Sequence, residues 1–181
     1  MILLLPCFLQ ACGLQDGTDK ASVVAPLAIE NEVVERALAD IVARNDTCLA
    51  AKIDPLVNGP NYWPSTLSSG DGKLSYAGDP RYDRAAQAWN EAKPLHSNSI
   101  RMPDQAVRQG FRMVDDARSD ASCLEVRTLH IPRFRGDFAF VATDVHWRST
   151  VHSRVDVQVL RLQRNRWVSI GSGTISSEPV I

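Results

Sequence analysis

The sequence predicts an α+β domain in which amphipathic helices pack on a C-terminal antiparallel meander of about four strands. Two observations predict this class. Residues 122–177 carry the only sustained alternation of apolar and polar side chains in the chain, which is typical of strands. Residues 26–44 instead place apolar side chains at helical spacing. The chain has 181 residues, of which 44% are hydrophobic, so we expect one domain over residues 23–181.

Three helices are expected before the meander. The first runs over residues 26–44, with a stripe of Val, Ala, Leu and Ile on one side. The second begins at Asp79 and Pro80, which have N-cap and first-turn chemistry, and stops before Pro94. The third covers residues 103–117. Its end would carry two Asp residues where the helix dipole disfavours carboxylates, so pairing with Arg, an earlier helix end and a cation site are all left open.

A long segment between the first two helices is rich in Pro, Gly, Ser and Asn. It covers residues 53–78, and Tyr62 and Trp63 are its aromatic anchor. So long a segment is unusual in a compact domain. It is either a structured loop over an apolar surface or a recognition lid.

The meander is expected to contain strands over residues 122–131, 138–147, 151–162 and 167–171. The turn at residues 163–166 lacks Gly, but Asn165 tolerates a positive φ. A three-residue turn at residues 148–150 would place His146 opposite His152, Asp144 opposite Arg154, and Val141 opposite Val157.

That register divides the meander into two faces. The first is a core face of odd-numbered residues: Val141, Val145, Trp147, Val151, Val155, Val157 and Val159. The second face is polar near the turn and apolar at its far end, where it holds Phe138, Phe140, Leu160, Leu162 and Trp167. Something must cover this apolar half, so we expect a binding surface formed by Tyr62, Trp63, Phe138, Phe140 and Trp167.

The N-terminus has the features of an export signal. Residues 1–11 form an uncharged apolar run too short to span a bilayer. Leu9-Gln10-Ala11-Cys12 resembles the lipobox of bacterial lipoproteins, although no Lys or Arg precedes the run. The resemblance implies that residues 1–11 are a signal peptide and that Cys12 is acylated and anchors the protein in the membrane. Residues 12–22 would then form a flexible tether. The alternative is that Cys12 is an ordinary thiol.

The other cysteines fit an oxidising compartment. Cys7 would leave with the signal, so Cys48 and Cys123 remain as an even pair. A disulfide between them would stabilise the fold by about 4 kcal/mol in the chain-entropy model. Two separate buried thiols are the alternative. We expect no zinc at these residues, because neither Cys has a His at ligand spacing.

His146 and His152 are the strongest candidates for chemistry. In the expected hairpin they are cross-strand neighbours beside Asp144, and two imidazoles with a carboxylate could hold zinc or perform acid–base work. A solvated pair of side chains is the competing interpretation. Helices ahead of a curved antiparallel sheet resemble the cone-shaped folds related to nuclear transport factor 2, but this likeness carries no catalytic residue.

The function expected from the sequence is therefore non-enzymatic. We expect an outer-membrane lipoprotein facing the periplasm that binds an envelope protein or a small ligand without a cofactor. The alternative is a small metal-assisted or acid–base enzyme using His146 and His152. With 20 basic and 21 acidic residues, the charge balance gives no sign of a nucleic-acid partner.

Overall fold

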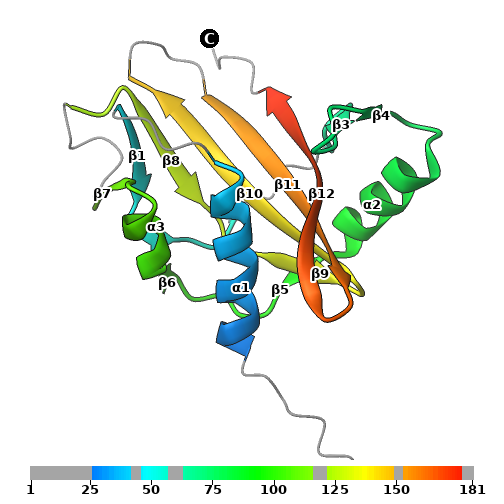
Figure 1. The fold of residues 1–181 in the computed structure, drawn as a ribbon, viewed down its shortest axis with the longest axis horizontal. Coiled ribbons are helices and arrows are strands. Elements are labelled where there is room, and N and C mark those ends of the chain that lie inside the picture. The colour runs from blue at the N-terminus through cyan, green and yellow to red at the C-terminus, as the bar shows by residue number, and fades with distance from the viewer. Residues whose placement is uncertain (1–25, 42–45, 57–62, 116–121, 149–152, 177–181) are drawn as a thin grey trace, which may run out of the picture.

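The computed structural model describes residues 26–41, 46–56, 63–115, 122–148 and 153–176, and its class is α+β (Figure 1). The expected signal, tether and Cys12 lie outside these residues. The helices are α1 (Pro26–Ala39), α2 (Pro80–Glu91) and α3 (Asp104–Arg108). In the described part of the chain, no helix has both the length and the apolar character needed to cross a bilayer.

The main sheet has ten strands, not the expected four or so. Its order is β4-β3-β12-β11-β10-β8-β1-β7, with β9 beside β10 and β5 beside β9, and β2 and β6 form a separate pair. The strands are β1 (Thr47–Ala50), β2 (Lys52–Ile53), β3 (Leu67–Ser68), β4 (Leu74–Ser75), β5 (Lys93–Pro94), β6 (Ile100–Arg101), β7 (Arg112–Val114), β8 (Glu125–Leu129), β9 (Arg133–Arg135), β10 (Phe138–Trp147), β11 (Ser153–Gln163) and β12 (Arg166–Ser176). The expected meander is thus the long centre of the sheet, and short upstream strands extend both edges.

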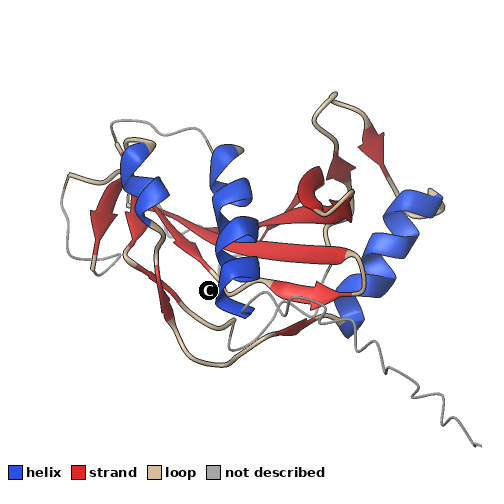
Figure 2. Cartoon of the chain, turned by 60° about the horizontal axis from the view of Figure 1, so that its bottom comes forward, coloured by secondary structure: helices blue, strands red, loops and turns tan. Residues whose placement is uncertain are grey.

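The sheet is buried on both faces. Alternate residues of β10 enter different cores, with Ala139 and Val141 on one side and Phe140 and Ala142 on the other. The first side packs against α1, which lies across the long strands (Figure 2), and is called the α1 face. The second packs against α2 and Trp63 and is called the α2 face. The stripe on α1 does pack on the sheet, as expected.

The register of the central hairpin differs from the expected one by a single residue. Val141 pairs with Gln158 and Ala142 pairs with Val157, whereas the sequence pattern predicted Val141 opposite Val157. Because side chains alternate along a strand, this shift exchanges the two faces of β11 relative to β10. The expected all-valine core face does not exist, and Val155, Val157 and Val159 share the α2 face with Phe140.

The helix predictions have mixed outcomes. The second is confirmed, since α2 begins after Asp79, whose side chain accepts a hydrogen bond from the Arg81 backbone N–H. The first is shorter than expected and ends at Ala39. The third is wrong beyond Arg108: Gly110 adopts a φ of 85°, which turns the chain into strand β7. Asp115 therefore follows a strand and not a helix, and Asp116 lies outside the described residues.

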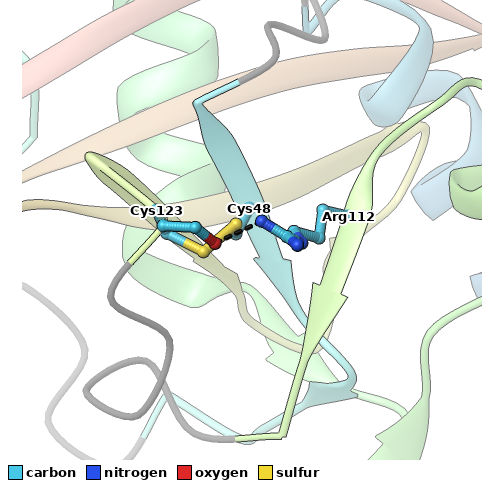
Figure 3. Close-up of a disulfide and its surroundings, with 4 residues drawn as sticks. Cys48, Arg112 and Cys123 are labelled. Atoms are coloured by element: carbon cyan, nitrogen blue, oxygen red, sulfur yellow. Dashed lines mark hydrogen bonds between the residues drawn. A yellow bond between two sulfur atoms is a disulfide. The ribbon is translucent and has the colours of Figure 1, made fainter.

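The expected disulfide is confirmed. Cys48 on β1 and Cys123 ahead of β8 are joined, at a sequence separation of 75 (Figure 3). Both are buried beside Val114 and Val126. Strand β1, which the sequence pattern did not reveal, runs parallel to both β7 and β8, so the bond holds the sheet where parallel pairs meet.

Candidate binding site

A cavity of about 380 Å³ lies on the α2 face between α2, the β3–β4 hairpin and the ends of β10, β11 and β12. Its size is within the range of small-molecule sites. The lining comprises Leu67, Ser69, Gly70, Asp71, Ser75, Arg81, Tyr82, Arg84, Ala85, Phe138, Arg161, Gln163, Ser169 and Ile170. It therefore combines an apolar wall with three arginines.

The local sequence explains how α2 presents its share of this lining. Asp79 caps the first turn and Pro80 begins the helix with a preset φ. Asp83 also accepts a hydrogen bond from the backbone N–H of Gly78, at 3.1 Å. These contacts define where the helix begins, so Arg81, Tyr82 and Arg84 are set at one end of the cavity.

The opposite side of the cavity comes from the β3–β4 hairpin. The Ser69 hydroxyl donates to Asp71 and to the carbonyl of Lys73, and Gly72 supplies a φ of 77° that the turn requires. The hydrogen bonds from Ser69 and Lys73 hold the pKa of the Asp71 carboxyl far below its usual range. The Asp71 carboxylate is therefore ionised and already bonded within its own turn.

The apolar wall rests on an aromatic cluster. Phe138 stacks on Phe140 with ring centroids 6.1 Å apart, and Trp63 packs against Phe140 at 5.9 Å. Trp63 also lies 5.7 Å from Trp89 and 6.1 Å from Tyr82. The Tyr82 hydroxyl donates to the Pro64 carbonyl at 2.7 Å, which joins the long upstream segment to α2. Phe138 thus lies on a closely packed cluster of aromatic rings.

The three arginines differ in their partners. Arg161 donates to Asp137 at 2.7 Å and lies over the Phe138 ring, while Arg81 forms an ion pair with Asp79 at 3.3 Å. Arg84 is exposed, and Nε donates to the Pro80 carbonyl at 3.0 Å. Arg84 forms no ion pair with a described acidic residue. Its guanidinium has further donors that could bind an anion.

The expected binding surface is divided by the observed register. Phe138 lines the cavity, and Trp63 and Phe140 lie beneath it in the same core. Trp167 is in the opposite core, where it packs against Phe134. Tyr62 lies outside the described residues. Arg84 and Arg161 were not among the expected site residues, because no local spacing connects a helix with a distant strand.

The expected pair of His146 and His152 extends beyond the described part of the chain and stays a prediction. His146 is exposed and pairs with Ser153, and His152 lies outside the described residues. Asp144 pairs with Val155 and lies 3.0 Å from Nε2 of the buried His130. No group of three His, Cys, Asp or Glu side chains within the described ranges is arranged to hold a metal ion.

A second histidine contact was also absent from the sequence interpretation. His96 Nε2 lies 2.6 Å from Oε2 of Glu30, whose side chain is fully buried on α1. Glu30 carries no distinguishing sequence signal, since it lies among other acidic residues of a helix. Comparison with known proteins adds no assignment: no family model, curated protein or solved structure matches this chain.

Proposed function

We propose that this protein is an exported, lipid-anchored envelope protein that binds an amphipathic anion in the α2-face cavity. The observation that carries the binding proposal is the juxtaposition of Phe138, Leu67 and Ile170 with Arg84, which forms no ion pair with a described acidic residue. An apolar wall favours a hydrocarbon tail, and guanidinium groups favour a carboxylate or phosphate head. A ligand with both parts would use both features of this lining.

The proposed compartment is supported by the disulfide. Cys48 and Cys123 are buried and bonded, and such bonds persist in oxidising compartments outside the cytosol. Together with the lipobox resemblance at residues 9–12, this favours an anchor at Cys12 and a domain facing the periplasm. The binding role needs no cofactor.

Binding is tested by calorimetry with decyl phosphate below its micelle concentration, with decanol and inorganic phosphate as probes of tail and head alone. We expect decyl phosphate to bind at least about tenfold more tightly than either part. Arg84→Glu and Phe138→Ala should each weaken it by about tenfold or more. Arg108→Glu, an exposed α3 arginine remote from the cavity lining, is the matched control and should bind as the parent does.

Two outcomes would reject the binding proposal. One is the absence of binding to the folded parent protein. The other is equal affinity of the parent and the Arg84→Glu variant, because a micelle-like or nonspecific contact would not depend on this side chain. Thermal melts of each variant show whether a loss reflects binding or unfolding.

The compartment is tested separately by the intact mass of the protein from its native bacterium. A chain beginning at acylated Cys12, with two thiols alkylated only after reduction, is the expected result. An unacylated chain that retains residues 1–11 and four free thiols would reject export and anchoring, and would leave the binding result standing.

A further inference from the structure

The α1 face carries a second, polar hollow beyond the end of the helix. It has a volume of about 250 Å³, and its lining includes Arg127, Thr143, Arg154, Asp156, Gln158 and Thr174. A neighbouring hollow of about 350 Å³ shares Asp40, Gln158 and Ser172 with it. The shared residues make the two hollows adjoining parts of one polar groove.

The sheet register places these polar side chains together. Thr143 pairs with Asp156, Asp156 pairs with Thr174, and Gln158 pairs with Ser172, so all of them belong to the face that α1 covers only in part. Helix α1 has 14 residues and β11 has 11. At their usual rises per residue, the helix is about 21 Å long and the strand about 36 Å long. Because α1 crosses the strands (Figure 2), it covers only part of the length of β11.

The hydrogen bonding of the buried Gln158 side chain is the observation that points to a ligand. The residue is only 8% exposed, and its Nε2 donates to the carbonyl of Ala37 at 3.0 Å. That bond sets the amide orientation, because a carbonyl can only accept. The other amide atom, Oε1, is buried and has no hydrogen-bond donor within the described residues. A buried acceptor of this kind is costly unless a donor reaches it.

The charges around the groove are already balanced. Arg127 donates to Glu125 at 2.6 Å, and the Arg154 side chain lies 3.0 Å from Asp156. Asp156 also accepts a hydrogen bond from Thr174 at 2.8 Å. A charged ligand would have to compete with these internal pairs, whereas a neutral one would not. The amide, hydroxyl and paired charged groups of the lining offer both hydrogen-bond donors and hydrogen-bond acceptors. A hydroxyl group of a ligand can also donate and accept, so hydroxyls match this lining.

Short serine side chains of β12 keep the groove open. Ser169 and Ser172 line the hollows with short side chains. Gly171 and Gly173 pair instead with Val159 and Val157 of the α2 face. A Cβ at Gly173 would lie 2.5 Å from Pro64, so this glycine admits the close approach of the upstream segment. The groove therefore has length along the strand and a polar floor, with few apolar groups to receive a hydrocarbon chain.

We infer that this groove binds a neutral, hydroxyl-rich ligand of the oligosaccharide class, with one of its hydroxyls donating to Gln158 Oε1. The 250 Å³ hollow shares no lining residue with the α2-face cavity. The 350 Å³ hollow shares Ser69, Gly70 and Ser169 with that cavity, so the groove and the cavity adjoin at the β3–β4 hairpin. The inference does not depend on the amphipathic anion proposed above.

The test is titration of the isotope-labelled folded chain with maltotriose, cellotriose and triacetylchitotriose, followed by amide and side-chain NMR shifts. At least one of the three should shift the Gln158 side-chain amide together with Thr143, Ser172 and Thr174. Gln158→Leu, which keeps the side chain's approximate size, and Ser172→Leu, which fills the groove, should weaken that binding by about tenfold or more.

The controls separate this site from nonspecific effects. Ser97→Leu makes the same chemical change as Ser172→Leu at an exposed position outside both linings, and should bind the sugar as the parent does. Arg84→Glu should also leave it unchanged. No shift with any of the three sugars at millimolar concentration would overturn the inference. So would shifts outside the groove, or unchanged affinity in Gln158→Leu and Ser172→Leu.

Discussion

The two faces of the central hairpin are built from the same strands, but different kinds of side chain cover them. The α2 face is filled by aromatic rings, with Trp63, Trp89 and Phe140 in mutual contact. The α1 face is apolar beneath the helix and polar beyond it, and α1 itself buries the carboxylate of Glu30. Apolar packing tolerates local rearrangement, whereas a buried polar group depends on one particular partner.

The difference explains why the candidate sites differ in chemistry. The α2-face cavity lies where the aromatic cluster ends and α2 supplies arginines, so its lining is amphipathic. The α1-face groove lies where a short helix stops over a strand that continues with Asp156 and Arg154. In both places the candidate site lies where the sheet extends beyond the structure that packs on it, which is the aromatic cluster on one face and α1 on the other.

The largest effect is expected from breaking the aromatic cluster. Phe140 is 1% exposed, and Phe140→Ala would leave a cavity between Trp63 and Trp89. We expect a loss of about 4 kcal/mol in the free energy of unfolding. Leu160→Ala, a fully buried change on the α1 face, should cost about 3 kcal/mol in the same urea titration. A smaller loss for Phe140→Ala than for Leu160→Ala would contradict the expectation that the aromatic cluster contributes more to stability than the apolar packing beneath α1.

The second largest effect is expected from breaking the contact between His96 and the buried Glu30 on the α1 side. His96→Ala would leave the Glu30 carboxyl, which is fully buried, without its partner. We expect a loss of about 2 kcal/mol, because a buried carboxyl group that loses its hydrogen-bond partner costs about this much. Denaturant unfolding measures this value.

The control for that change is His146→Ala, which removes an exposed imidazole from β10 and should alter stability by no more than about 0.5 kcal/mol. Adding Glu30→Gln to His96→Ala should recover part of the loss, because a neutral amide costs less to bury than a carboxylate. Equal stability of His96→Ala and the parent would show that Glu30 does not rely on this contact.

The smallest effect is expected at Tyr82. Burial raises the pKa of its phenol above the ordinary value of 10.0, and neighbouring Asp83 adds to the shift. Below about pH 10 the phenol is neutral in both states, so its contribution is fully present. As pH rises, the unfolded chain loses the proton first, and the contribution is lost as pH passes through the raised folded pKa.

Tyr82→Phe removes the hydrogen bond to Pro64 and should lower stability by about 1 kcal/mol at pH 7. The gap between parent and variant should then narrow above pH 10, as followed by urea titrations from pH 7 to pH 11. A constant gap over that range would contradict the assigned cause. This comparison isolates Tyr82 from the other groups that titrate at high pH.

Local signals in the sequence determined several elements of this fold. Asp79 and Pro80 predict the start of α2 because a cap and a preset φ act within one turn. Asn165 predicts the β11–β12 turn, where it adopts a φ of 60°. Phe138 was also identified as a candidate binding residue, and it lines the α2-face cavity.

The tertiary structure alone decided the register, and with it which side chains share a site. Both faces of β10 and β11 are largely apolar where they are covered, so sliding the hairpin by one residue leaves the pattern almost unchanged. Trp167 therefore lies in the core beneath α1 and not beside Phe138. The contact between Glu30 and His96 also joins residues far apart in sequence. Period-two alternation is a property of one strand, whereas register depends on packing against elements far away in sequence.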